Sequence, residues 1–144
     1  YTLALIAYGL WIMSQPSRIH FTQDLRSELN ELLQRHHIAG NPALLCDTNT
    51  YAAGAESLIK ALPKQSTMIN LGLQVKPRLA RAEDVCRQIA QASCIIVYGS
   101  GTLTDIAKYA AFHAGIACIS IPSAASMNGY ASPSASLIDS NGYK

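Results

Sequence analysis

The sequence predicts an α/β fold class, a Rossmann-like parallel sheet with helices on both faces. Uninterrupted apolar runs alternate along the chain with stretches of helical periodicity. Uninterrupted apolar strands are typical of parallel sheets buried on both faces, and the alternation is typical of strand–helix–strand units. The 144 residues, 49% hydrophobic and 14% charged, are enough for one domain with a buried core.

The first predicted helix has Thr22 as its N-cap. Four leucines then share one helical face, at spacings of four, seven and eight residues from the first: Leu25, Leu29, Leu32 and Leu33. Gly40 and Pro42 indicate the end of this helix.

Four apolar runs predict strands, at 43–47, 67–73, 94–98 and 117–121. The helices between them are predicted in TNTYAAGAESLIKAL, which Pro63 ends, at about 81–92, and at about 103–114, which Gly115 ends. After the last strand the composition changes to serine, alanine, glycine, asparagine and proline. This polar segment follows the carboxyl end of a strand, where open α/β sheets bind ligands, although a plain linker has the same composition.

The N-terminal segment, residues 1–17, is apolar and is assigned to no element. Its first thirteen residues carry no charge. No apolar run reaches the roughly 18 residues of a membrane span, and no basic segment precedes this run as in a signal peptide. We expect the segment to pack in the core or against another copy in a homo-oligomer, and the chain to be part of a longer protein.

The net charge bears on nucleic-acid binding, and the positions of the cysteines bear on the cellular compartment. The net charge of +2 is too small to indicate nucleic-acid binding. The four cysteines form no Cys-x-x-Cys pair, and three lie in apolar runs: Cys46, Cys94 and Cys118. Buried, reduced thiols are expected there, which favours a cytoplasmic protein.

Gly99, Ser100 and Gly101 stand between a predicted strand and a predicted helix. Glycines allow a sharp turn and a close approach of a ligand, and the N–H groups that begin a helix attract anions. The spacing matches neither G-x-G-x-x-G nor a Walker loop, so a bare turn is an equal alternative. Asp105 either complements the helix dipole or bonds a ligand, and Lys108 either points to a phosphate or pairs with Asp105.

VYGSGTLTDIAKYAA, followed by ISIPSAASMNGYASPSASL, resembles the iron-containing alcohol dehydrogenase superfamily, and within it the glycerol-1-phosphate dehydrogenase branch. The resemblance covers roughly residues 18–144. It implies an NAD(P)-binding α/β domain there, the N-terminal domain of a dehydroquinate synthase-like fold. It also implies a metal- and NAD(P)-dependent oxidoreductase that interconverts dihydroxyacetone phosphate and sn-glycerol 1-phosphate, with this chain as its nucleotide-binding half, inactive alone.

The resemblance also implies roles for single residues. The pyrophosphate region of NAD or NADP would lie against Gly99, Ser100, Gly101 and Asp105. The nicotinamide end of the cofactor would be lined by Ser123 and Ser126, with Ser132 as a further contact. Asp47 would receive the ribose hydroxyls, which suits NAD over NADP, although a carboxylate in a local turn is the alternative for this residue.

Asn128 departs from the family pattern, which has aspartate at this substrate-binding position. An asparagine can bond a hydroxyl of the polyol phosphate but cannot act as a base. The family's zinc or iron would be held by a C-terminal helical domain that this chain does not include. We therefore name no metal ligand among His20, His36, His37 and His113, for which structural or surface roles are expected.

Three alternatives to this function stay open. The chain could be related to a glycerol dehydrogenase or to a 3-dehydroquinate synthase. It could also be a nucleotide-binding module without catalysis, because Asn128 replaces the family aspartate and metal ligands are absent.

Overall fold

The computed structural model describes residues 2–7, 18–124, 132 and 134–143. The strands are β1 (Thr2–Ala7), β2 (Arg18–Thr22), β3 (Ala43–Cys46), β4 (Thr67–Asn70), β5 (Cys94–Gly99) and β6 (Ala117–Pro122). The helices are α1 (Leu25–Arg35), α2 (Thr48–Thr50), the π-helical turn η1 (Tyr51–Ala55), α3 (Glu56–Ala61), α4 (Leu79–Gln88) and α5 (Gly101–Ala114).

The described strands form one sheet with the order β2-β1-β6-β5-β3-β4. The four strands β3 to β6 are parallel, as the sequence predicts, and agree with the predicted runs to within three residues at each end. The sheet also includes β1, which pairs antiparallel with β6 and with β2. This antiparallel edge was not predicted, and it brings part of the unassigned N-terminal segment into the same sheet.

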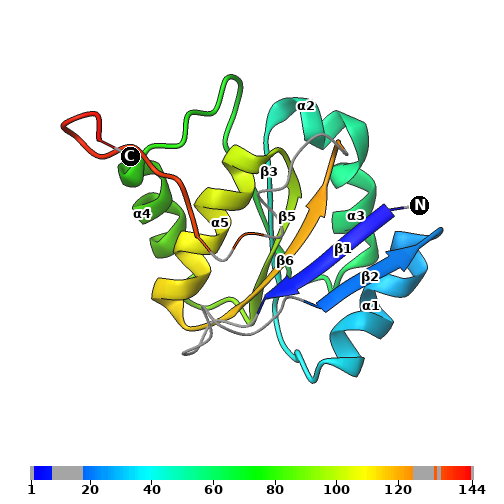
Figure 1. The fold of residues 1–144 in the computed structure, drawn as a ribbon. Coiled ribbons are helices and arrows are strands. Elements are labelled where there is room, and N and C mark those ends of the chain that lie inside the picture. Colours follow the sequence, from blue (N-terminus) through cyan, green and yellow to red (C-terminus); the bar gives the residue numbers. More distant parts are fainter. Residues whose placement is uncertain (1, 8–17, 125–131, 133, 144) are drawn as a thin grey trace.

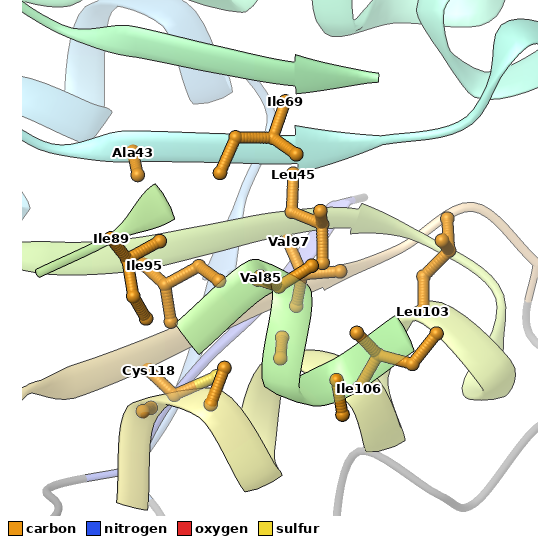
Figure 2. Packing of buried hydrophobic residues seen from close by; sticks show 14 residues of the cluster. Ala43, Leu45, Ile69, Val85, Ile89, Ile95, Val97, Leu103, Ile106 and Cys118 are labelled. Atoms are coloured by element: carbon orange, nitrogen blue, oxygen red, sulfur yellow. The ribbon is translucent and has the colours of Figure 1, made fainter. Parts of the chain in front are cut away.

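Helices cover both faces of the parallel strands, α1 and α3 on one face and α4 and α5 on the other (Figure 1). Successive residues of β3 point to opposite faces: Leu44 packs with the leucines of α1, and Leu45 packs with Val85 of α4. Figure 2 shows the second cluster, in which Ile95 and Val97 of β5 lie between the sheet and the helices. The sheet therefore separates two apolar cores.

The N-cap of α1 is Asp24, so the prediction of Thr22 at this position is wrong. The Asp24 carboxylate accepts hydrogen bonds from the backbone N–H groups of Arg26 and Ser27, at 3.2 and 3.3 Å. Thr22 ends β2 instead, and its hydroxyl accepts the N–H of Asp24 at 3.0 Å. The helix also ends before Gly40, at Arg35. The leucine face is as predicted, since all four leucines are buried.

The C-terminus of α5 is at the predicted residue. Gly115 adopts a left-handed conformation with φ 67°, a region that glycine enters at little cost. Its N–H and that of Ile116 donate to carbonyls of the last helical turn. The chain can therefore reverse at once into β6, as the sequence indicates.

Candidate functional site

The order of the parallel strands creates a switch point between β3 and β5. From β3 the chain continues to its neighbour β4 on one side, and from β5 it continues to β6 on the other side. In open α/β sheets, ligands bind outside the carboxyl ends of the strands at such a point. The residues that follow these two strands are Asp47 and Ser100, both of which the sequence singles out.

The predicted glycine loop connects β5 directly to α5. Gly99 ends the strand, Ser100 is the N-cap with φ −76° and ψ 171°, and Gly101 begins the 14-residue helix. The Ser100 side chain makes no capping hydrogen bond, in contrast to Asp24 on α1 and Asp47 on α2. The N-terminus of α5 thus lies at the carboxyl edge of the sheet without a capping carboxylate, which suits an anionic ligand.

Gly99 is glycine for a packing reason. A Cβ at this position would overlap the side chain of Leu103, a fully buried residue in the first turn of α5. The carbonyl of Gly99 accepts the N–H of Ser123 at 3.1 Å. The missing side chain therefore lets α5 start close to the strand, and the carbonyl fixes the beginning of the segment after β6.

Asp47 holds the backbone at the carboxyl end of β3. Its carboxylate Oδ1 accepts the Thr50 N–H at 2.7 Å and the Thr50 hydroxyl at 2.8 Å, and its own N–H donates to Thr50 Oγ1 at 3.0 Å. This is a capping box, in which side chain and backbone of two residues satisfy each other. The predicted local-turn role of Asp47 is present, and it also fixes a half-buried carboxylate at the switch point.

Burial and the neighbouring carboxylate raise the pKa of the Cys46 thiol to about 11, with desolvation as the larger cause. Burial likewise raises the pKa of Cys94 and of Cys118 to about 12. All three thiols are buried and free, as predicted from their apolar surroundings. A thiol with such a raised pKa is protonated at neutral pH and is a poor nucleophile.

Asp105 and Lys108 form an ion pair on α5, with 3.1 Å between Oδ1 and Nζ. The sequence left open whether Lys108 pairs with Asp105 or points to a phosphate, and the structure shows the pair. Only 18% of the Asp105 side chain and 12% of the Lys108 side chain are exposed. The pair is therefore much less solvated than the Lys60–Glu56 pair on α3, whose side chains are more than half exposed.

The serine segment after β6 is described in part. Ser123 is exposed and donates its N–H to the glycine loop, and the Ser132 hydroxyl lies 2.9 Å from that of Ser134. Ser126 and Asn128 lie outside the described residues. Of the predicted site residues, the structure thus places Asp47, the glycine loop and Ser123 at or beside the carboxyl edge, and Asp105 and Ser132 around Lys108.

Two threonines that the sequence analysis did not single out stabilise the carboxyl edge of the sheet. Thr50 completes the capping box of Asp47, and its position three residues after an N-cap aspartate could have indicated it. Thr104 is buried and donates to the carbonyl of Ser100 at 3.1 Å, while its oxygen lies 3.2 Å from the buried hydroxyl of Ser120. That contact joins α5 to β6 and has no local sequence signal.

The described residues contain no group of three or more histidine, cysteine or acidic side chains that could hold a metal ion, and we assign no metal ligand among them. His36 is buried at the end of α1, and its Nε2 lies 3.2 Å from Nε2 of His20 on β2. His20 and His36 therefore pack the antiparallel edge against α1. In the part of the chain that the structure describes, no helix is long and apolar enough to cross a membrane.

Comparison with known proteins places these features in a family. A family profile described as iron-containing alcohol dehydrogenase matches residues 20–144. The chain belongs to this family. The match includes both segments on which the resemblance was based, the glycine loop with α5 and the serine segment after β6.

The curated relatives are named glycerol-1-phosphate dehydrogenase [NAD(P)+]. The protein from Methanobrevibacter smithii is 26% identical over 87% of this chain and 36% of its own length. The protein from Bacillus velezensis is 32% identical over 78% of this chain and 30% of its own length. The chain thus spans about a third of the length of these relatives.

Solved structures show the same fold. A protein described as a probable glycerol dehydrogenase from Sinorhizobium meliloti superposes with a TM-score of 0.61 over 81% of this chain and 33% of its own, at 21% identity. The glycerol dehydrogenase from Schizosaccharomyces pombe superposes with a TM-score of 0.51 over 64% of this chain and 24% of its own, at 22% identity. The predicted α/β class, with helices on both faces of a parallel sheet, is confirmed.

Proposed function

We propose that the protein is an NAD(P)-dependent oxidoreductase that interconverts dihydroxyacetone phosphate and sn-glycerol 1-phosphate, and that this chain is its nucleotide-binding part. One observation carries the proposal. In a member of the iron-containing alcohol dehydrogenase family, two features flank the switch point of the sheet: the N-terminus of α5, whose N-cap serine makes no side-chain capping hydrogen bond, and a fixed carboxylate. The name of the curated relatives supports the substrate.

In this proposal, the pyrophosphate of NAD or NADP binds at the glycine loop, where the first N–H groups of α5 and the helix dipole favour negative charge. Gly101 leaves room for the phosphate oxygens to approach the backbone. Asp47 accepts hydrogen bonds from the adenosine ribose, with its carboxylate already oriented by Thr50. When bound, the cofactor supplies or accepts the hydride of the reaction.

The remaining roles follow the family resemblance. Ser123, Ser126 and Ser132 bind near the nicotinamide end, Asp105 supports the phosphate region, and Asn128 donates to or accepts from a hydroxyl of the polyol phosphate. The catalytic zinc or iron belongs to the C-terminal helical domain of the longer protein, and the nucleotide domain comprises residues 18–144 together with β1, which is part of the same sheet. We further propose that the protein is cytoplasmic and homo-oligomeric, which the buried free thiols and the exposed Ile19 and Phe21 of edge strand β2 support.

Titration of the full-length protein with NADH and NADPH, followed by calorimetry, tests the nucleotide site. Saturable binding is expected, and Gly101→Val should abolish it, because the valine branches would occupy the space against the buried start of α5. Ala114→Val is the matched control, since it adds the same side chain at the opposite end of this helix. Binding that survives Gly101→Val, with the control unchanged, would contradict the phosphate site.

Turnover then tests the substrate. The rate of NADH or NADPH oxidation should be highest with dihydroxyacetone phosphate as the substrate. In the opposite direction, rapid reduction of NAD or NADP with glycerol as the substrate would indicate a glycerol dehydrogenase instead. Nucleotide binding without turnover of either would favour a module without catalysis, the alternative that Asn128 motivates.

A further inference from the structure

Lys108 makes further contacts besides its ion pair with Asp105. Its ammonium Nζ also donates to the backbone carbonyl of Ser132 at 3.2 Å and to the carbonyl of Ser134. An ammonium group has three N–H donors, and acceptors of the chain itself lie within reach of them here. With 12% of its side chain exposed, Lys108 is committed to protein acceptors, and a direct contact with a phosphate is unfavourable.

Ser134 begins a segment that runs from α5 to the N-terminus of α4, and we call its residues 134–138 the C-terminal strap. At its far end, the Ile138 carbonyl accepts the Leu79 N–H at 2.9 Å, and the Ile138 N–H donates to Pro77 at 2.6 Å. Leu137 packs against the core between the sheet and α4 and α5. The strap is therefore fixed to α4 by its backbone at one end and to α5 by Lys108 at the other.

Lys108 also sets the charge near the glycine loop. Asp105 lies four residues after Gly101, which is about 6 Å along the axis of α5. A carboxylate so close to a bound pyrophosphate would repel it. The ammonium of Lys108 neutralises Asp105 at 3.1 Å, in a place where limited exposure weakens the screening by water.

We propose that Lys108 is a positioning residue of the nucleotide site, which holds Ser132 and the C-terminal strap against α5 and neutralises Asp105 beside the glycine loop. The inference rests on the proposed function, since Ser132 is a cofactor contact only if the site binds NAD(P). It assigns to Lys108 an action through other residues, without contact to the cofactor.

The first measurement is the dissociation constant of the full-length protein for NADH and NADPH, with Lys108→Met as the variant. We expect the constant to rise about tenfold or more, because a misplaced contact and an unpaired carboxylate both oppose binding. Lys60→Met is the matched control: it removes the lysine of an exposed Lys–Glu pair on α3 and should leave binding unchanged. Should Lys108→Met not yield folded protein, Lys108→Gln removes the same charge with a polar side chain.

A further variant and an exchange measurement separate positioning from stability. Val85→Ala lowers the melting temperature through the fully buried face of α4 and should leave nucleotide binding unchanged well below that temperature. Hydrogen exchange of the nucleotide-free protein should become faster in residues 134–138 in Lys108→Met and unchanged in Lys60→Met.

A raised dissociation constant together with faster exchange in the strap supports the inference. Binding by Lys108→Met equal to that of the unmodified protein overturns the inference and leaves the proposed function standing. An equal loss of affinity in Val85→Ala overturns it as well, because the effect would then be one of stability. If the unmodified protein binds neither nucleotide, the proposed function fails and the inference falls with it.

Discussion

The Asp47 carboxylate has a structural role that is compatible with the binding role proposed for it. One oxygen accepts the N–H and the hydroxyl of Thr50, so the side chain is held in a single orientation where β3 ends. A carboxylate oriented in this way can bond ribose hydroxyls without a further loss of side-chain freedom, and its charge repels a 2′-phosphate. The two interpretations that the sequence left open for Asp47 are therefore compatible.

Substitution Asp47→Asn tests the proposed binding role. Asparagine is about as good an N-cap as aspartate, so the melting temperature should change little. Without the negative charge, the affinity for NADPH should rise relative to that for NADH, measured by calorimetry on both nucleotides. Asp47→Ala is the control for the cap and should lower the unfolding free energy by about 1 kcal/mol. An unchanged NADPH-to-NADH ratio in Asp47→Asn would remove Asp47 from the ribose site.

The cysteines predict an order of reactivity. Alkylation requires the thiolate, and burial raises the pKa of Cys46 to about 11 and that of Cys94 and Cys118 to about 12. At pH 8, iodoacetamide should therefore label the half-exposed Cys86 first, as mass spectrometry of peptides would show. Labelling of all four cysteines at one rate in the folded protein would contradict the buried positions; in urea, equal rates are expected.

The same pKa shifts make the unfolding free energy depend on pH. The pKa of each buried thiol is raised by folding, from the value of 9.0 for an unperturbed thiol. The stabilising contribution is then complete well below the unfolded-state pKa of 9.0 and is lost as the pH rises through that value toward the folded-state values. We expect the unfolding free energy of Cys118→Ala to fall less between pH 8 and pH 10 than that of the unmodified protein, by urea denaturation at both values.

At the scale of elements, the contact between α5 and β6 depends on two buried hydroxyls. Thr104 donates to Ser100, and the Ser120 hydroxyl has Thr104 Oγ1 within 3.2 Å. Thr104→Val should lower the unfolding free energy by about 1–3 kcal/mol, because it leaves the Ser120 hydroxyl buried without this partner. Adding Ser120→Ala should recover part of the loss, since both polar groups are then removed.

Urea denaturation of Thr104→Val and the double variant measures this coupling. Thr102→Val, on the same helix and only partly buried, is the matched control and should change the free energy by less than about 0.5 kcal/mol. A double variant that is less stable than Thr104→Val by the full cost of Ser120→Ala would show that the hydroxyls do not interact.

Elements with local signals were predicted, and those that depend on distant pairing were not. The parallel strands are continuous apolar runs, and Gly115 ends α5 by its own left-handed conformation. Strand β1 is equally apolar, but its partner β6 lies more than a hundred residues away, and nothing local separates it from a packed or targeting segment. The misplaced cap of α1 arose because Thr22 and Asp24 are both good N-caps, and only the backbone decides between them.

At the scale of the whole molecule, the sequence predicts that ligands bind at the carboxyl ends of the strands, and it places Asp47 and the glycine loop directly after two of them. The switch point itself depends on the order of the strands in the sheet, which has no local sequence signal. The contacts of Lys108 could not be expected in the same way, since Ser132 and Ser134 are 24 and 26 residues further along the chain. A sequence pattern shows the spacing of Asp105 and Lys108 but not which loop returns to them.

The last prediction concerns the two apolar cores, and it tests whether the sheet between them transmits strain from one core to the other. Leu29 of α1 and Ile106 of α5 are both fully buried, on opposite faces of the sheet. Leu29→Ala should cost about 2–5 kcal/mol of unfolding free energy and Ile106→Val about 0.5–1.5 kcal/mol. Because the substituted side chains share no neighbours across the sheet, the double variant should lose the sum to within about 0.5 kcal/mol. Urea denaturation followed by circular dichroism measures all three, and a coupling above about 1 kcal/mol would show that the strands shift to fill a cavity on either side.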